Sequence, residues 1–167
     1  MDPSRASRIV LLGPAGSGKT TLGRTLAAAR GVLFLCLDDI WQPSWTAADT
    51  PRFREIVAAA HAGDAWISDG NFAAVTFDLR LPRADLIVWL DRPRLGCAWR
   101  AFARVFRAGE PHRIGGLVKA MAFIWNFDRV NRPRIEAARR AHGPDVPVIR
   151  LTSASDIAAF LREASQA

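Results

Sequence analysis

A glycine-rich segment near the N-terminus carries the clearest chemistry in the chain. Residues 13–20 read Gly-Pro-Ala-Gly-Ser-Gly-Lys-Thr and fit the pattern G-x-x-x-x-G-K-[ST]. The glycines let the loop curl so that successive backbone N–H groups point at phosphate oxygens, and a helix that follows offers its positive N-terminus to the same anion. We expect Lys19 to reach the β- and γ-phosphates of ATP, and the Thr20 hydroxyl to ligate Mg²⁺. The nucleotide-binding residues predicted here are Gly13, Ala15, Gly16, Ser17, Gly18, Lys19, Thr20 and Thr21.

The residues on either side of this segment favour the phosphate-binding interpretation. The apolar run 8–12 precedes it, and residues 18–30 follow with Leu22 and Leu26 at helical spacing. A glycine-rich loop between a strand and a helix is the context in which this motif binds phosphate. We therefore interpret it as a P-loop, and not as a glycine-rich turn with a surface lysine.

Five short apolar runs alternate with helical patterns along the chain. They cover residues 8–12, 32–37, 65–68, 85–90 and 146–151. Such continuous runs are typical of parallel strands buried on both faces. We predict that residues 1–167 form a single domain of the α/β class, with the three-layer P-loop NTPase fold: a five-stranded parallel sheet, helices on both faces and a short arginine-rich lid. Ligands of such sheets bind beyond the carboxyl ends of the strands. The residues predicted at those ends are Gly13, Asp38, Asp69, Asp91 and Thr152.

Several motifs beyond the P-loop are spread along nearly the whole chain. They are Leu37-Asp38-Asp39-Ile40-Trp41, Pro43-Ser44-Trp45, Trp66-Ile67-Ser68-Asp69-Gly70-Asn71-Phe72, Asp78-Leu79-Arg80, Ala84-Asp85 through Trp89-Leu90-Asp91, and Trp125 with Arg132-Pro133-Arg134. With the P-loop, they resemble the adenylate-kinase-like branch of P-loop kinases, and more narrowly the bacterial FlaR-type "topology modulation" proteins. That narrower name describes a phenotype and states no chemistry. The resemblance implies ATP and Mg²⁺ as cofactors, and transfer of the γ-phosphoryl group to a small-molecule acceptor.

The resemblance also implies roles for residues at the ends of two strands. Asp69-Gly70 matches the Asp-Gly pair whose Asp holds the water shell of Mg²⁺ in adenylate kinases, although an Asp in a turn or helix cap fits the same pattern. After Asp91-Arg92-Pro93, two arginines follow four residues apart and share a helix face. Arg100 would then lie against the adenine, and Arg104 would clamp the transferring phosphates.

Three further expectations concern the second half of the chain. Residues 108–119 would form a short lid that closes over the triphosphate and excludes water. Arg129 or Arg132 would supply a further lid-side arginine, and we take Arg132 as the catalytic candidate, although helix spacing does not decide between them. Ser153 would lie at the adenine edge through backbone contacts.

The residues leave two classes of acceptor open, a phosphate and a hydroxyl. Nucleotide kinases usually follow Asp-Gly with Phe-Pro-Arg, whose arginine grips the acceptor's phosphate, whereas this chain has Asn71-Phe72-Ala73. Arg52, Arg54 and Arg80 are substitutes, or else surface residues. A nucleotide acceptor is therefore in doubt.

A hydroxyl acceptor is the alternative that Asp38 suggests. A hydroxyl benefits from a carboxylate that orients it and takes its proton, and Asp38 falls at the end of the second predicted strand. Asp38 is therefore a candidate base or Mg²⁺-shell ligand, or a cap of the turn. The aromatic residues Trp41, Trp45 and Phe72 would form an apolar wall for a flat substrate, or else cover the core.

The charge balance leaves two other function classes open. The net charge is +7, and residues 92–140 hold eleven arginines, which suggests an anionic partner or a composition rich in Arg and Ala codons. A nucleic-acid-associated ATPase is disfavoured because we find no recognition helix and no aromatic-basic strand motif. A regulatory ATP-binding module without turnover is the other alternative. The sequence leaves monomer and dimer open.

The cysteines point to a reducing compartment, and neither they nor the histidines have the spacing of a metal site. Cys36 and Cys97 lie far apart in apolar patterns, so we predict core packing and a cytoplasmic protein. No apolar run approaches the roughly 20 residues that span a bilayer, and the polar N-terminus does not read as a signal peptide. The histidines are predicted to be surface or helix-end residues; they are His61, His112 and His142.

Overall fold

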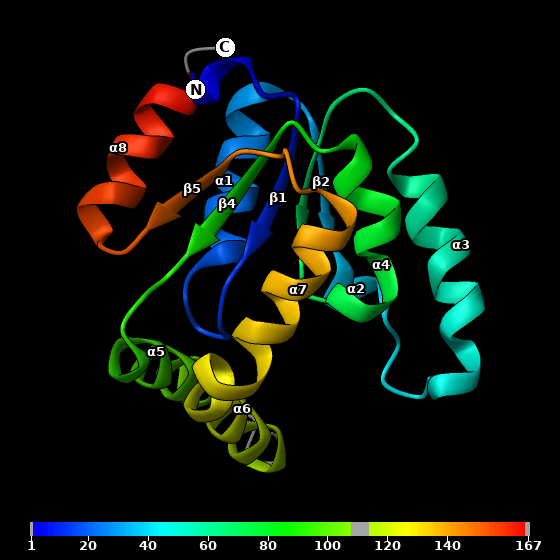
Figure 1. The fold of residues 1–167 in the computed structure, drawn as a ribbon. Helices are drawn as coiled ribbons and strands as arrows, with labels where there is room; N and C mark the ends of the chain where they lie inside the picture. The colour runs from blue at the N-terminus through cyan, green and yellow to red at the C-terminus, as the bar shows by residue number, and fades with distance from the viewer. Residues whose placement is uncertain (1, 108–113, 166–167) are drawn as a thin grey trace.

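The chain folds around a five-stranded parallel sheet (Figure 1). The computed structural model describes residues 2–107 and 114–165, without the side chains of residues 104–107, 114–117 and 119. The strands are β1 (Arg8–Leu12), β2 (Leu33–Cys36), β3 (Trp66–Asp69), β4 (Leu86–Leu90) and β5 (Val148–Leu151). Every neighbouring pair is parallel, and the order across the sheet is β2-β3-β1-β4-β5. The predicted parallel sheet is confirmed.

The strand order places the loop after β1 at the centre of the sheet's carboxyl edge. β1 lies between β3 and β4, with Leu11 beside Asp69 and Leu12 beside Trp89. The chain leaves β1 toward β2 on one side, and β4 lies on the other. A reversal of this kind opens a crevice at the carboxyl ends, where ligands of such sheets bind.

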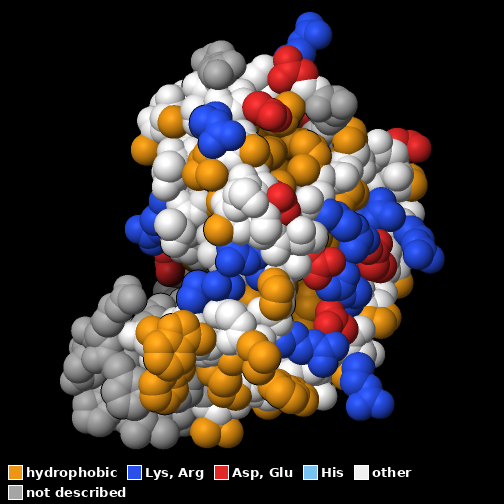
Figure 2. Space-filling view, turned by 90° about the vertical axis from the view of Figure 1, so that its left-hand side faces the viewer, with side chains coloured by type: hydrophobic (Ala, Val, Ile, Leu, Met, Phe, Trp, Pro, Cys, Tyr) orange, Lys and Arg blue, Asp and Glu red, His pale blue; other side chains and the backbone are white. Residues whose placement is uncertain are grey.

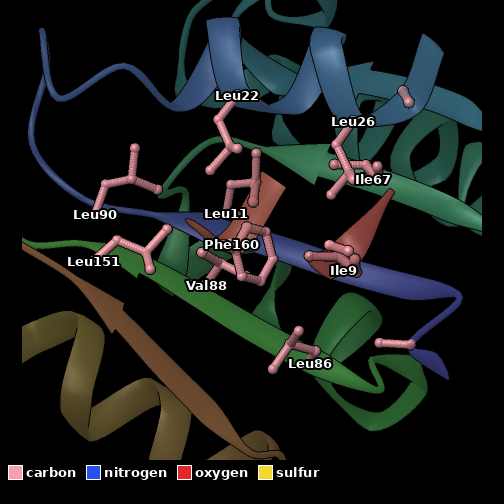
Figure 3. Packing of buried hydrophobic residues seen from close by; sticks show 13 residues of the cluster. Ile9, Leu11, Leu22, Leu26, Ile67, Leu86, Val88, Leu90, Leu151 and Phe160 are labelled. Atoms are coloured by element: carbon pink, nitrogen blue, oxygen red, sulfur yellow. The ribbon is translucent and has the colours of Figure 1, made fainter. Parts of the chain in front are cut away.

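One face of the sheet is covered by α1 (Lys19–Arg30) and α8 (Ala154–Ala164) (Figure 1). Leu22 and Leu26 point from α1 toward Ile9 and Leu11 of β1, as Figure 3 shows. Phe160 brings α8 into the same apolar cluster. Burial of these side chains holds the start of α1 against the end of β1, which is where the P-loop lies.

The other face carries α4 (Ala73–Arg80), α7 (Arg132–His142) and, outside α4, α3 (Thr50–Ala60). Its core joins Trp66 and Trp89 of the sheet to Phe77 of α4 and Ile135 of α7. Helices thus cover both faces, which confirms the three-layer α/β fold. The short helix α2 (Leu37–Ile40) follows β2 directly, so Asp38 lies on its first turn and not on a strand end.

A helical pair, α5 (Arg94–Arg107) and α6 (Ile114–Asn126), lies across the carboxyl edge of the sheet (Figure 1). Cys97, Ala101 and Ile124 pack together and contact Ala15 of the P-loop. A π-helix, η5 (Phe127–Asn131), connects α6 to α7. Of the predicted lid at 108–119, residues 108–113 lie outside the described part of the chain, and 114–119 are the first turns of α6.

Two minor predictions have clear outcomes. Cys36 and Cys97 are both buried and free, so core packing is confirmed. His61 ends α3, as expected, but it is 1% exposed and is therefore not a surface residue. Within residues 2–107 and 114–165, no helix is both long and apolar enough to cross a bilayer.

Candidate functional site

The P-loop adopts a backbone conformation that only its glycines allow without strain. Gly13 and Gly16 have φ values of 140° and 74°, which L side chains rarely adopt. A Cβ on Gly13 would lie 2.4 Å from the carbonyl oxygen of Leu90, and one on Gly16 would lie 2.3 Å from that of Cys97. Both glycines are therefore required by the close approach of β4 and α5 to the loop.

Two side chains of the loop are arranged as a phosphate site requires. Lys19 is the first residue of α1, and its Nζ donates to the carbonyl oxygen of Pro14 at 3.0 Å, so the ammonium group curls back over the loop. Ser17 is 2% exposed, and its Oγ has no hydrogen-bond partner among the described residues. A buried hydroxyl of this kind favours a ligand that completes its hydrogen bonding.

Thr20 and Asp69 form the pair that the sequence assigned to Mg²⁺. The Thr20 hydroxyl donates to Asp69 Oδ2 at 2.5 Å. Asp69 is 1% exposed, and its Oδ1 is buried without a partner in the described part of the chain. An oxygen-only site with one carboxylate suits Mg²⁺, which keeps several waters and takes its other ligands from phosphates. The residues therefore fit the metal. Residues 2–107 and 114–165 hold no cluster of three or more His, Cys, Asp or Glu that could bind one without such outside ligands.

Asn71 contacts the P-loop directly, which the sequence did not reveal. Its Nδ2 donates to the carbonyl oxygen of Gly13 at 2.9 Å, and its Oδ1 accepts from the Gly13 N–H at 3.2 Å. This paired contact ties the turn after β3 to the first residue of the loop. The only signal was its position directly after Asp69-Gly70, in the Asp-Gly-Asn-Phe motif.

Arg80 is a buried structural residue and not a surface one. It is 0% exposed, and its guanidinium donates to the carbonyl oxygens of Gly70 and Asn71 at 2.9 and 3.3 Å. It also donates to Ser68 Oγ at 3.1 Å and to Thr76 Oγ1 at 3.0 Å. Burial lowers the pKa of Arg80, whereas the nearby Asp69 raises it. Arg80 therefore holds the turn that carries Asn71.

His61 extends this buried network to α3. Its Nδ1 lies 2.7 Å from the carbonyl oxygen of Val57, and its Nε2 lies 2.8 Å from Ser68 Oγ. Burial lowers the pKa of His61 to about 4, so the ring is neutral near pH 7. Nδ1 must then donate to the carbonyl, and Nε2 accepts from the Ser68 hydroxyl. That leaves a lone pair of Ser68 Oγ for Arg80, so the hydrogen bonds are mutually consistent from Val57 to Arg80.

We expect Arg80→Met to lower the free energy of unfolding by roughly 3 kcal/mol, because buried carbonyl and hydroxyl groups lose their donor. Methionine keeps most of the aliphatic length, which limits the cavity. Urea unfolding at constant m-value measures the change. Arg24→Met is the control: Arg24 is exposed and makes one ion pair, at 3.4 Å, so we expect a change within about 0.5 kcal/mol. Equal stability of the two variants would contradict the structural role of Arg80.

A pocket of about 350 Å³ is lined by Lys19 and by the acceptor candidate Asp38, and for that candidate we label it the acceptor-side pocket. Its lining combines charged, polar and aromatic groups with one small apolar residue: Ala15, Lys19, Asp38, Asn71, Phe72 and Phe123. Asp38 comes from α2 and Phe123 from α6. The structure thus brings the predicted candidate Asp38 into one pocket with Lys19.

The aromatic residues near this pocket divide into two roles. Trp41 and Trp45 pack edge-to-face with ring centroids 5.7 Å apart, and Trp41 packs in the same way on Phe53 at 5.1 Å. Phe72 lies 5.0 Å from Phe53 and is the member of this cluster that lines the pocket. The two tryptophans therefore mainly cover the small core around Phe53, and the apolar wall comes from Phe72.

A second pocket, also of about 350 Å³, is lined by Lys19 and by the nucleotide candidate Arg100, and for that candidate we label it the nucleotide-side pocket. It is formed by the P-loop, the start of α1 and one face of α5: Gly16, Gly18, Lys19, Thr20, Thr21, Trp99, Arg100 and Ala103. Arg100 Nε donates to the carbonyl oxygen of Gly16 at 2.6 Å. The predicted nucleotide residue Arg100 thus lies at this site, whereas the side chain of Arg104 is outside the described part of the structure.

Arg132 and Ser153 have partners outside both pockets. Arg132 donates to Asp91 through both Nη atoms, and its Nε donates to Asp128 Oδ1 at 2.9 Å. Its hydrogen bonds lower the pKa of the Asp91 carboxyl. Ser153 caps α8 by accepting from the Asp156 N–H at 3.0 Å. Neither residue is among the described lining residues, and their roles in catalysis and adenine binding stay predictions.

Comparison with solved structures identifies the fold. The chain is similar to a shikimate kinase from Acinetobacter baumannii, solved in complex with shikimate, with a TM-score of 0.63 and 17% identity over 95% of this chain and 91% of that one. A gluconokinase from Sinorhizobium meliloti 1021 gives a TM-score of 0.57 and 20% identity over 96% and 90%. This chain has a P-loop kinase fold. No family model matches it, and no curated protein sequence does.

The likeness of fold also extends to a solved structure of lower sequence identity. A deoxyadenosine kinase from M. mycoides, solved with bound dCTP, gives a TM-score of 0.50 and 9% identity over 96% of this chain and 100% of that one. At these identities the likeness concerns the fold alone. The substrates and the chemistry of this chain therefore depend on the residues of its own two pockets.

Proposed function

We propose that this protein is an ATP- and Mg²⁺-dependent kinase that transfers the γ-phosphoryl group to a hydroxyl of a small acceptor. The observation that carries the proposal is the position of Lys19, which lines both the nucleotide-side and the acceptor-side pocket. A group transferred between two bound molecules must pass the point at which their pockets meet. Lys19 lies at that point.

The proposed reaction rests on positioning and on charge stabilisation, which supply most of the catalysis in phosphoryl transfer. The N–H groups of the P-loop bind the phosphates, and Lys19 stabilises the charge on the group in transfer. Thr20 and Asp69 would hold Mg²⁺, which neutralises phosphate charge when bound. Asp38 orients the acceptor hydroxyl and takes its proton as the oxygen bonds to phosphorus and ADP leaves.

The lining of the acceptor-side pocket favours a hydroxyl over a phosphate acceptor. Lys19 is the one cation among its described lining residues. Arg54, a candidate phosphate clamp, is paired with Asp78 at 2.6 Å and also donates to the carbonyl oxygen of Val75. Arg80 is buried within its own network. The carboxylate of Asp38 would repel a phosphate at the same place.

ADP release across a panel of acceptors tests the proposal. The panel holds nucleosides, nucleoside monophosphates, polyols and hydroxy acids, with Lys19→Ala as the blank. We expect acceptors with a free hydroxyl to stimulate release above the blank. Stimulation by monophosphates alone would contradict the hydroxyl assignment, and a panel without stimulation, in a protein that binds ATP, would favour a regulatory module.

We expect Asp38→Asn to lower kcat by about 10²-fold, because the amide cannot accept the hydroxyl proton. The KM for ATP should stay within about twofold, since the nucleotide contacts are unchanged. Steady-state kinetics with the best acceptor measures both. Asp39→Asn is the matched control, because Asp39 is the adjacent exposed carboxylate and is not among the described lining residues. Equal rates for the two variants would show that Asp38 is a turn residue.

We further propose that residues 1–167 form one domain of the adenylate-kinase-like branch, similar to the FlaR-type proteins. The support is Asp69-Gly70 at the end of β3, with Asp69 bonded to the P-loop threonine. A cytoplasmic location is proposed because Cys36 and Cys97 are both free thiols.

A further inference from the structure

Trp99 is an exposed aromatic residue in a pocket that is otherwise made mostly by the P-loop and the start of α1. It is 68% exposed, although it lines the nucleotide-side pocket. Its ring stacks on that of Phe102, with centroids 5.9 Å apart and an interplanar angle of 22°. Figure 2 shows hydrophobic side chains gathered on the lower part of the molecule, where α5 and α6 lie. A large apolar ring exposed at a binding site favours contact with a ligand.

Arg100, the neighbouring residue, is engaged with the protein itself. Its Nε donates to the carbonyl oxygen of Gly16 at 2.6 Å, and its Nη2 lies 3.6 Å from Cys97 Sγ. These contacts fix the rotation of α5 on the P-loop. The edge of the Arg100 guanidinium group is thereby committed to positioning α5 against the P-loop.

The rotation of α5 turns Trp99 and Ala103 toward the same pocket. These residues are four positions apart and therefore lie on one face of the helix, and both line the pocket together with Thr21. Ala103 is small enough to leave room beside the indole. Phosphates bound by the P-loop N–H groups would fill the P-loop end of this pocket, which leaves the α5 end for the nucleoside.

We propose that Trp99 is the stacking surface for the base of the bound nucleotide, a role that the sequence analysis gave to Arg100. The inference rests on the proposed function and adds a specificity residue to it. Stacking on an indole uses the π-face that every base has and reads no hydrogen-bond pattern. The protein should therefore accept ATP and GTP with similar affinity and bind CTP, which has a smaller ring, more weakly.

Calorimetric titration of ATP, GTP, CTP and inorganic tripolyphosphate tests this assignment. In Trp99→Ala we expect the Kd for ATP to rise on the order of 10-fold, and the Kd for tripolyphosphate, which has no base, to stay within about twofold. Trp99→Phe should restore most of the ATP affinity, because it keeps an aromatic face. Alanine is a strong helix former, so α5 should remain intact.

Trp125→Ala is the matched control. Trp125 is 59% exposed and lies on α6, but it is not among the described residues of either pocket. We expect its substitution to leave the Kd for ATP unchanged. Equal losses of ATP and tripolyphosphate affinity in Trp99→Ala, or no loss at all, would overturn the base-stacking role alone. Failure of the wild-type protein to bind either compound would overturn the proposed function together with it.

Discussion

Lys19→Ala should lower kcat/KM for phosphoryl transfer by about 10³-fold, one of the two largest effects that we expect from one side chain. The Lys19 ammonium group is held over the P-loop by its bond to Pro14 and lines both pockets. Its removal takes away a positive charge that is held in place at the point of transfer. Water molecules that fill the space must reorient during the reaction and therefore stabilise the phosphoryl charge less well. ADP release at saturating acceptor measures the loss.

The control for Lys19→Ala is Arg162→Ala, which removes an exposed cation on α8, on the sheet face that α1 also covers. We expect its activity to match that of the wild-type protein. Thermal unfolding of both variants shows whether the fold is retained. A Lys19→Ala protein that is folded and fully active would contradict the proposed function as a whole.

Asp69→Asn should produce the second large effect, about 10³-fold in kcat/KM, because charge stabilisation by a metal contributes several kcal/mol. The amide oxygen of asparagine can still accept the hydrogen bond from the Thr20 hydroxyl, but the side chain lacks the negative charge that favours Mg²⁺ binding. The half-saturating concentration of Mg²⁺ should rise at least about 10-fold. A second readout, independent of turnover, is binding of Mn²⁺ in the presence of ADP, followed by electron paramagnetic resonance.

Asp64→Asn is the matched control for the metal site. Asp64 is exposed and precedes β3, at the opposite end of the strand from Asp69. Because Asp69 also stabilises the buried charge of Arg80, both variants are compared well below their melting temperatures. Unchanged Mn²⁺ binding in Asp69→Asn would show that the carboxylate serves only to cap the Thr20 hydroxyl.

Much of the secondary structure was predictable because its signals are local. The run 8–12 corresponds to β1 without a change of bounds, and the run 85–90 extends β4 by one residue. β3 and β4 are buried along their whole length, as strands with a helix layer on each face are, and their runs hold few polar residues. By contrast, α4 follows Asn71-Phe72 with no clear start signal: its N-cap residue, Phe72, makes no capping bond. For that reason the sequence did not predict α4.

The partners of the site's polar groups could not be read from the sequence. Asn71 and Gly13 are 58 positions apart, and Arg100 and Gly16 are 84 apart. Contacts of this length depend on strand order and helix rotation, which no local pattern encodes. For the same reason Arg80 was a surface candidate by its type, although folding buries it beneath the turn that it holds.

The sequence by itself determined the phosphate-binding chemistry and the class of fold. The P-loop is a local motif whose backbone conformation follows from its glycines, and the apolar runs alone indicate a parallel sheet. Only the tertiary structure decided which residues share a pocket. The packing of α5 and α6 across the carboxyl edge placed Lys19 between two pockets, with Asp38 in one and Trp99 in the other. That division depends on contacts between segments far apart in the chain, so it exists only once the helices have packed on the sheet.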